Sequence, residues 1–361
     1  MKYIPYYFIL IAIFIIAIIS CNKDDDSNIN QDDTAVKKYV WAVGMQDSTG
    51  YGLILFSDDG GNKWERQGEG SDVLKNVTLN DVWAVDENTV WAVGNNNTIL
   101  KTTDGGNNWT KVTPPSGYST VSLASISLAG TDNIWISGSA GIVYNSTKGG
   151  ANWTVFDAGF FHHGLMQGIH AVNPEIVYVV GSYSPGKDEE KGFIAVTTDG
   201  GQTWDSIVPE NNFNRNLWIG VTSADAENII IYGGKSHYVY TNDDGQTWNN
   251  DSILNTGGTD GADINCLKMI NPQTWWGAFD YDGIYLTQDN GISWINQTSP
   301  PPAGMWLIGL DYYNSDIAVI VGVETSSLFG KIIQTTDGGN HWELKQTWDT
   351  WINKVSYIKN R

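Results

Sequence analysis

The stretch Thr102-Thr103-Asp104-Gly105-Gly106-Asn107-Asn108-Trp109 returns in close copies along almost the whole sequence. Each copy follows the pattern Ser/Thr-x-Asp-x-Gly-x-x-Trp, and neighbouring copies begin between 44 and 51 residues apart. The copies begin at Ser57, Thr102, Ser146, Thr197, Thr241, Thr287 and Thr335. This period fits one four-stranded propeller blade. We therefore predict an all-β protein, a single seven-bladed β-propeller of four-stranded antiparallel blades.

Each residue type in the repeated turn has a mechanical role. Asp and Ser/Thr side chains accept hydrogen bonds from backbone N–H groups of their own turn, and Gly adopts the positive φ of a tight hairpin. The Trp returns to the sheet as an apolar anchor. Seven equivalent turns around a ring cannot line one site, so we predict that they are structural rather than catalytic or metal-binding. The structural Asp and Trp residues are Asp59, Trp64, Asp104, Trp109, Asp199, Trp204, Asp243, Trp248, Asp289, Trp294, Asp337 and Trp342, and the third copy has Lys148 in the Asp position.

These turns resemble the Asp-box (BNR) repeat of the sialidase-like propellers. The flanking strands, at 82–85, 90–94 and 99–103, most resemble the photosystem II assembly/stability factor type of propeller. The resemblance covers roughly residues 38–358 and implies chaperone-like binding of a membrane protein. Fold resemblance alone leaves activity open, because one fold hosts many functions.

The two ends of the repeat region predict how the ring closes. Val40-Trp41-Ala42-Val43-Gly44 matches the second strand of a later repeat, so the first blade begins without its innermost strand. The segment 351–358 follows the last box and resembles residues 79–85, an innermost strand. We expect this C-terminal strand to pair beside residues 40–44, which removes an exposed sheet edge.

The N-terminal segment has the features of an export signal. Residues 1–20 contain Lys2 and then an apolar run, which is typical of a signal peptide. Ile18-Ile19-Ser20-Cys21 resembles a bacterial lipobox, so we expect lipid attachment at Cys21. Residues 21–37 form a predicted acidic flexible tether, whose Lys23-Asp24-Asp25 resembles the export signal of Bacteroidetes surface lipoproteins, and residues 38–361 form the propeller. We expect an exported, surface-exposed outer-membrane lipoprotein that contacts the membrane only through its lipid.

Charge and composition narrow the function classes. The formal net charge is -20, with only 20 Lys and Arg, so we expect no nucleic-acid partner. Of the two Cys, Cys21 belongs to the leader and Cys266 to an apolar strand, where we expect a small buried core residue. We find no pattern for a cofactor, a metal site or a catalytic group.

The candidate ligand face is the one opposite the boxes, where the longer loops emerge around the central channel. Phe160-Phe161-His162-His163 is the most suggestive loop, and it is open to three interpretations: a metal or base site, a contact surface, or a packed loop. We place Arg215, Trp306 and Trp351 on the same face. Trp306, Trp348 and Trp351 are assigned to connections and Trp218 to a strand start, whereas most other Trp residues are predicted to pack between blades.

Two enzyme classes conflict with the sequence. Resemblance to sialidases would require three arginines around a substrate carboxylate. The chain has three in total, but Arg66 follows a box Trp on an outer strand and Arg361 is the last residue, which leaves Arg215 alone near the candidate face. Resemblance to the xyloglucanases would require a cleft between two propellers. The leading hypothesis is a non-catalytic cell-surface scaffold for protein binding or assembly. The alternatives are a surface glycan-binding protein or, less favoured, a glycoside hydrolase or lyase. Protein binding predicts a broad apolar patch, and glycan binding predicts coplanar exposed aromatic rings.

Overall fold

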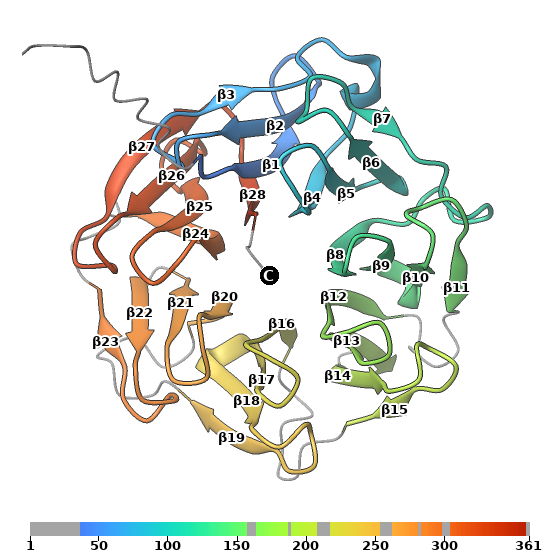
Figure 1. Ribbon diagram of the computed structural model, residues 1–361, viewed down its shortest axis with the longest axis vertical. Helices are drawn as coiled ribbons and strands as arrows, with labels where there is room; N and C mark the ends of the chain where they lie inside the picture. The colour runs from blue at the N-terminus through green and yellow to red at the C-terminus, as the bar shows by residue number, and fades with distance from the viewer. Residues whose placement is uncertain are drawn as a thin grey trace, which may run out of the picture. The chain divides into compact units, whose positions relative to one another are not determined.

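The computed structural model describes residues 37–156, 164–186, 189–207, 217–252, 262–280, 283–297 and 304–358. The described residues form seven four-stranded antiparallel sheets, which are arranged radially as the blades of a propeller (Figure 1). The predicted fold class and blade count are thereby confirmed.

Each blade runs from an innermost strand at the central channel to an outer strand. The innermost strands are β28 (Ile352–Tyr357), β4 (Leu79–Ala84), β8 (Leu123–Ala129), β12 (Leu165–Ala171), β16 (Trp218–Ser223), β20 (Ile264–Met269) and β24 (Met305–Tyr312). The second strands are β1 (Val40–Gln46), β5 (Val90–Gly94), β9 (Asn133–Gly138), β13 (Val177–Gly186), β17 (Ile229–Gly233), β21 (Trp275–Phe279) and β25 (Ala318–Glu324). The third strands are β2 (Gly52–Ser57), β6 (Thr98–Thr102), β10 (Val143–Ser146), β14 (Glu189–Thr197), β18 (His237–Thr241), β22 (Gly283–Thr287) and β26 (Gly330–Thr335). The outer strands are β3 (Glu65–Arg66), β7 (Thr110–Lys111), β11 (Thr154–Phe156), β15 (Asp205–Ser206), β19 (Asn249–Ser252), β23 (Ile295–Asn296) and β27 (Glu343–Trp348).

The second strands carry the core between neighbouring blades. Every residue of β5, β17 and β21 is buried, because these strands are covered on both faces by adjacent sheets. Burial on both faces explains why their sequences are almost continuously apolar rather than alternating. Trp41, Trp91 and Trp135 are fully buried in this layer, as are Trp275 and Trp276, so these tryptophans pack between blades as predicted.

The box turns have the predicted hydrogen bonds. In the second blade, Thr102 Oγ1 donates to Asp104 Oδ1 at 2.8 Å and accepts from Gly106 N at 2.9 Å, while Asn108 N donates to Asp104 Oδ1 at 2.9 Å. The other five intact boxes repeat this arrangement. In the third blade, where Lys148 replaces the Asp, the hydroxyl of Ser146 still accepts from Gly150 N at 2.9 Å.

The C-terminal strand closes the ring. β28 pairs antiparallel with β1, from Val40 opposite Tyr357 to Gly44 opposite Ile352, and it forms the innermost strand of the first blade (Figure 1). This pairing confirms the predicted closure. The first and last strands of the propeller therefore share one sheet, and the inner edge of β1 is paired rather than open.

Every innermost strand has a β-bulge near its start. The register shifts by one residue there, and the bulged residue has no pairing partner on the second strand. The bulged residues are Asn353, Asn80, Ala124, Gln167, Ile219, Asn265 and Ile308. Glycine is needed opposite the bulge in the second blade, because a Cβ on Gly94 would lie 2.0 Å from the carbonyl oxygen of Thr78. The bulges place seven equivalent side chains around one end of the channel.

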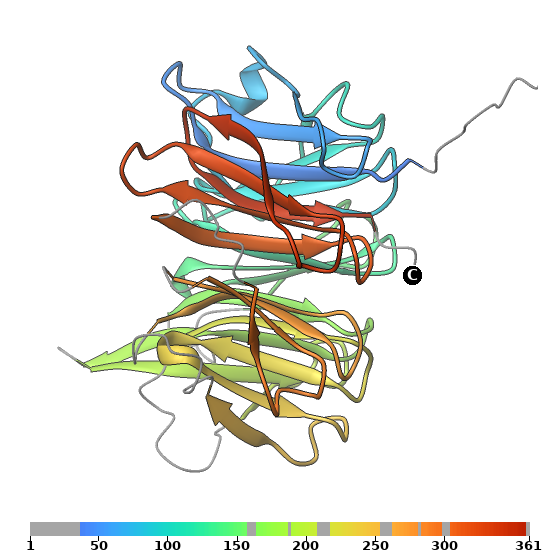
Figure 2. The ribbon, with the colours of Figure 1, turned by 90° about the vertical axis from the view of Figure 1, so that its left-hand side faces the viewer.

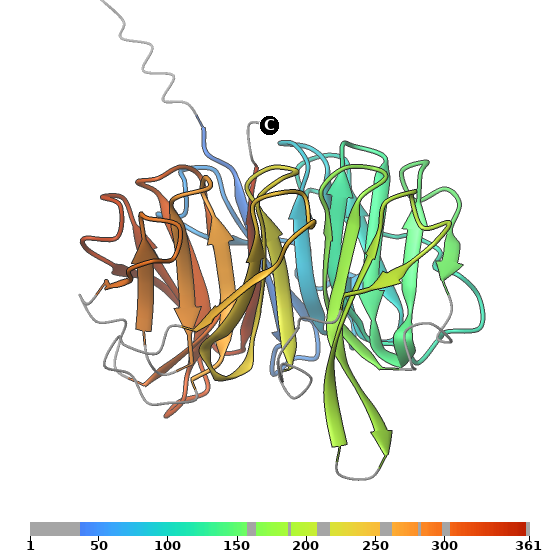
Figure 3. The same ribbon diagram turned by 90° about the horizontal axis from the view of Figure 1, so that it is seen from below.

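The connections define two faces. The box face holds the turns between third and outer strands, and the rim face is the opposite one. On the rim face the β13–β14 hairpin of the fourth blade extends beyond the other blades (Figures 2 and 3). Short 3-10 turns also occur in connections, namely η1 (Asp72–Leu74), η2 (Ser139–Gly141) and η4 (Gly234–Ser236). Among the described residues, no helix has the length and apolar character needed to span a membrane.

Candidate functional site

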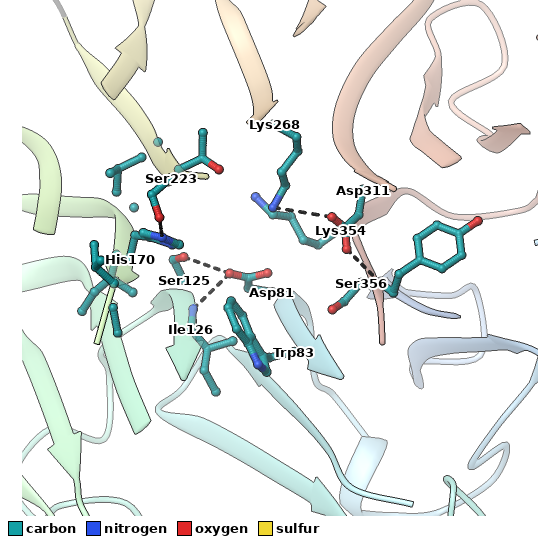
Figure 4. A pocket seen from close by; sticks show the side chains of 18 of the residues that line it. Asp81, Trp83, Ser125, Ile126, His170, Ser223, Lys268, Asp311, Lys354 and Ser356 are labelled. Atoms are coloured by element: carbon teal, nitrogen blue, oxygen red, sulfur yellow. Dashed lines mark hydrogen bonds and ion pairs between the residues drawn. The ribbon is translucent and has the colours of Figure 1, made fainter. Parts of the chain in front are cut away.

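The innermost strands enclose a channel with a cavity of about 980 Å³. Polar side chains from several blades meet in this cavity, and Figure 4 shows how they lie across from one another. They are Asp81, His170, Ser223, Lys268, Asp311, Lys354 and Ser356. A cluster with carboxylates, an imidazole and hydroxyls is the first place to test for catalytic chemistry.

Two carboxylates of the channel, Asp81 and Asp311, act as links between blades. Asp81 Oδ2 accepts from Ser125 Oγ at 2.9 Å and from Ile126 N at 3.0 Å, both on the neighbouring third blade. Asp311 Oδ2 accepts from Tyr357 N at 2.8 Å, which lies on the neighbouring first blade. Both Asp side chains are almost fully buried, at 5% and 3% exposure. Each carboxylate accepts a backbone N–H of the neighbouring blade, so we interpret both carboxylates as structural.

Asp311 stands three residues after the bulge of its strand, and the same position makes a link in other blades. There a side chain on one innermost strand contacts the residue that stands four positions after the bulge of the next blade. The pairs are Ser127 Oγ with Ala171 N at 3.0 Å, Ser356 Oγ with Ala84 N at 3.1 Å, and His170 Nε2 with Ser223 Oγ at 2.7 Å. Because these contacts follow the repeat, the polar lining of the channel stabilises the ring.

The two channel lysines balance the carboxylates. Lys268 Nζ lies 3.9 Å from Asp311 Oδ1. Burial lowers the pKa of Lys354, but the neighbouring Asp81 and Asp311 carboxylates outweigh it, and the pKa is raised overall. A lysine with a raised pKa keeps its proton at neutral pH, so Lys354 is unsuited to act as a general base.

The rim-face mouth of the channel has a different character. A cavity of about 350 Å³ lies there, and its lining is dominated by apolar side chains and amides. Trp306 and Trp351 form an edge-to-face pair inside it, with ring centroids 5.5 Å apart and an interplanar angle of 78°. The other lining residues are Met45, Asn80, Ala124, Leu165, Gln167, Ile219, Asn265, Ile308, Asn353 and Lys354. We call this set, with the two tryptophans, the rim cavity.

Amides in the rim cavity are already engaged in blade contacts. The Nδ2 groups of three bulged asparagines each donate to the backbone carbonyl before the bulge of the next blade. The bonds run from Asn80 to Leu123 O at 2.7 Å, from Asn265 to Leu307 O at 2.6 Å, and from Asn353 to Leu79 O at 2.8 Å. The apolar side chains therefore make up most of the surface that the cavity offers to a ligand.

Asp280 is a carboxyl at the rim whose pKa is raised. It directly follows the second strand of the sixth blade and accepts a hydrogen bond from Asn265 Nδ2. Burial raises the pKa of Asp280, and the hydrogen bond from Asn265 offsets this only in part. The sequence around Asp280 indicates only an ordinary turn.

The predicted site residues divide into two groups. Trp306 and Trp351 lie together in the rim cavity, although Trp306 is on strand β24 rather than in a connection. Phe160, Phe161, His162, His163 and Arg215 lie outside the described residues, as does Cys21.

Two other predictions about single residues have clear outcomes. The assignment of Trp348 to a connection is wrong, because it is the last residue of the six-residue strand β27 and pairs with Gly330 of β26. Cys266 is fully buried, as predicted, and its thiol lies 3.5 Å from the carbonyl oxygen of Leu310. The described residues contain no cluster of three His, Cys, Asp or Glu side chains able to hold a metal.

Comparison with known proteins agrees with this architecture. Residues 71–216 match the family described as photosynthesis system II assembly factor YCF48. The match spans the second, third and fourth blades. No curated protein matches the sequence.

Solved structures with the same fold include two YCF48 proteins. YCF48 from Cyanidioschyzon merolae aligns with a TM-score of 0.61 and 16% identity over 85% of this chain and 98% of that one. YCF48 bound to D1 peptide aligns with a TM-score of 0.56 and 20% identity over 74% and 81%. The GH74 enzyme of Niastella koreensis gives a TM-score of 0.53 and 16% identity over 88% of this chain but only 59% of its own. At these identities the structural likeness shows the fold alone.

Proposed function

We propose that this protein is a non-catalytic scaffold that binds a segment of a partner protein at the rim face. The observation that carries the proposal is the rim cavity, where the edge-to-face pair of Trp306 and Trp351 borders an apolar hollow. Large aromatic side chains beside a pocket are the typical anchor of a protein-binding surface. The YCF48 structure with a bound D1 peptide supports the proposal, because a propeller of similar fold binds a peptide.

A surface glycan is the second candidate, and the geometry favours it less. Stacking on a sugar requires an open ring face, whereas Trp306 and Trp351 meet at 78°. The neighbouring amides of Asn80, Asn265 and Asn353 donate to backbone carbonyls, which reduces their capacity to bind sugar hydroxyls. A glycoside hydrolase is supported only by the fold likeness to a GH74 enzyme. The channel carboxylates Asp81 and Asp311 accept backbone hydrogen bonds, which argues against that activity.

The proposal includes the expected lipid anchor at Cys21. The described chain begins on the box face, where Lys37 Nζ lies 2.8 Å from Asp58 Oδ2 and Gly60 N donates to Lys38 O at 2.9 Å. A tether attached there would leave the rim cavity on the opposite face, free for a partner. Radiolabelled palmitate incorporation, abolished by Cys21→Ser, tests the anchor separately from binding.

The binding proposal is tested by isolating the full-length tagged protein from its own cells after brief crosslinking. We expect one or a few proteins to be retained by the wild type and by Trp294→Ala, and lost with Trp306→Ala plus Trp351→Ala. Trp294 is a matched control because it is a half-buried tryptophan of a box turn, on the opposite face. A glycan array probed in parallel covers the alternative. The proposal would be contradicted if no protein were captured and the wild type bound a glycan, with that binding lost on the same double substitution.

A further inference from the structure

The connection between β25 and β26 in the seventh blade exposes two large apolar side chains. Leu328 is 56% exposed and Phe329 is 43% exposed. Leu328 also has φ +61, a conformation that is rare and unfavourable for a branched residue. An exposed leucine in a left-handed conformation gives no evident gain in folding stability, and such strained positions concentrate at functional sites.

The connection is held in one shape by its own hydrogen bonds. Leu328 N donates to Glu324 O at 2.8 Å, and Glu324 N donates to Phe329 O at 2.9 Å. The Glu324 carboxylate accepts from Ser327 Oγ at 2.5 Å and lies 3.5 Å from Lys331 Nζ. These bonds close a compact turn, so the two apolar side chains are presented from a braced scaffold.

This turn adjoins the rim cavity through the strands of the same blade. Trp306 pairs with Val323, directly before the turn. On its other side, Gly330 N donates to Thr350 O at 3.0 Å, and Thr350 precedes Trp351. The apolar surface of the rim cavity therefore has a second contact point on the seventh blade, which we call the Leu328–Phe329 turn.

Carboxylates flank these two apolar points. Asp280 is linked to the strand of Trp306 through Asn265, which also donates to Leu307 O at 2.6 Å. Asp349 is exposed and lies two residues before Trp351. Of the nearby lysines, Lys331 is paired with Glu324, and Lys354 of the rim cavity lies beside the Asp81 and Asp311 carboxylates. The whole chain has a net charge of -20. A cationic partner fits this charge distribution better than an acidic one.

We propose that the rim cavity and the Leu328–Phe329 turn together bind an extended segment with two large apolar side chains flanked by Lys or Arg. This inference rests on the proposed function, since it specifies the partner chemistry at the same face. One apolar side chain enters beside Trp306 and Trp351, and the other lies on Leu328 and Phe329. Asp280 and Asp349 attract the basic flanks.

The test is selection of random 12-residue peptides displayed on phage against the full-length protein. We expect enriched peptides that combine aromatic or large aliphatic residues with an excess of Lys and Arg. Leu328→Ser plus Phe329→Ser should lower the affinity for a selected synthetic peptide about tenfold or more, as is common for apolar anchors of an interface. Asp349→Asn should lower this affinity less, and the affinity of that variant should depend less on salt concentration than that of the wild type. The matched control is Ile292→Ser plus Ile295→Ser, which alters two exposed apolar residues outside the rim face and should leave binding unchanged.

Three results separate the possibilities. Enriched peptides that are acidic, or that bind Leu328→Ser plus Phe329→Ser as tightly as wild type, would overturn this inference. If Trp306→Ala plus Trp351→Ala still abolished binding of those peptides, the proposed function would stand without this further inference. Failure of the wild type to enrich any peptide would contradict both. Unchanged thermal melts of the variants verify that each one is folded.

Discussion

The box face and the rim face of this propeller are built from the same seven repeats and differ in what is repeated. On the box face, six turns share one set of hydrogen bonds, and even the degenerate third turn keeps the bond from Gly150 N to Ser146. On the rim face, the bulge itself recurs in every blade, but its side chain varies among Asn, Gln, Ala and Ile. We therefore interpret the contacts that repeat in every blade as those that hold the ring together. The side chains that vary between blades are those that can determine which ligand binds.

The channel shows why this comparison is informative. Its polar residues first suggest chemistry, yet Asp311, Ser127 and Ser356 occupy equivalent positions and each accepts a backbone N–H from the next blade. Trp306 and Trp351 have no such repeat-wide counterpart, since the other blades place different residues at the mouth. The following predictions test whether stability and binding separate in this way.

Removal of the closing strand should have the largest effect. Deleting residues 352–361 removes β28, which forms the innermost position of the first blade, and leaves the edge of β1 unpaired. We expect loss of the cooperative thermal transition or of solubility, measured by circular dichroism and sedimentation. Deleting only residues 359–361 is the control and should melt like the intact protein. Equal melting of the longer truncation would contradict the role assigned to β28.

The box tryptophan of the second blade should matter for stability alone. Trp109 is 6% exposed and packs in the core cluster of the first two blades. Trp109→Ala should lower the free energy of unfolding by about 3 to 5 kcal/mol, the usual cost of removing a buried aromatic side chain. Denaturant titration measures this, and partner retention per folded molecule should not change. If Trp109→Ala kept its stability but no longer retained the partner, Trp109 would serve binding rather than stability, contrary to this account.

The rim tryptophans should show the opposite behaviour. Trp306→Ala plus Trp351→Ala removes the proposed anchor and should weaken binding about tenfold or more, because anchors of this kind dominate an interface. Both side chains are only half-buried, so we expect a smaller loss of stability than for Trp109→Ala. Parallel binding and denaturant curves give both values. A stability loss as large as that of Trp109→Ala would show that the pair is core.

Asp280 should make stability depend on pH in a defined direction. Burial raises its pKa in the folded protein above the unfolded value, so the folded state holds the proton more tightly. This carboxyl therefore costs stability once it ionises, as the pH rises from the unfolded pKa of about 4 through the raised folded pKa. Asp280→Asn should raise the melting temperature at pH 7, and the difference should vanish near pH 3. A substitution with the same effect at both pH values would rule out this cause.

Repair of the degenerate box should have the smallest effect. Lys148→Asp restores a carboxylate that can accept from Ser146 and from the backbone, as Asp104 does in the second blade. We expect a gain of about 0.5 to 1.5 kcal/mol, the net worth of an ordinary hydrogen bond. Lys148→Ala is the control for losing the lysine alone. A gain shared equally by both variants would show that the lysine, not the missing acceptor, weakens the turn.

The sequence predicted the fold well because the repeat is a local signal. The pattern around Asp104 and Trp109 specifies a turn, its period specifies a blade, and the likeness of residues 40–44 to residues 90–94 specifies the closure. The site was only partly predictable. The repeat register placed Trp306 and Trp351 on the rim face, and the structure brings them together there.

Other parts of the site depend on pairing that no local pattern reveals. The bulges that direct Ile308 and Asn353 to the channel mouth arise from the register between two strands. The raised pKa of Asp280 depends on burial by residues distant in sequence. Trp348 was misassigned because the last blade has a longer outer strand than its neighbours, with six residues where β3 and β7 have two.

The central claim is that the partner is bound on the rim face, and paired photocrosslinking tests it most directly. A photoreactive amino acid is introduced at Leu165, which is 42% exposed in the rim cavity, or at Ile292, which is 84% exposed in a box turn. Full-length variants are expressed in the native cells and irradiated, and the adducts are identified by mass spectrometry. We predict that Leu165 yields a specific protein adduct, abolished by Trp306→Ala plus Trp351→Ala, and that Ile292 does not. The same adduct from Ile292, with none from Leu165, would contradict the assignment of the rim face as the binding surface.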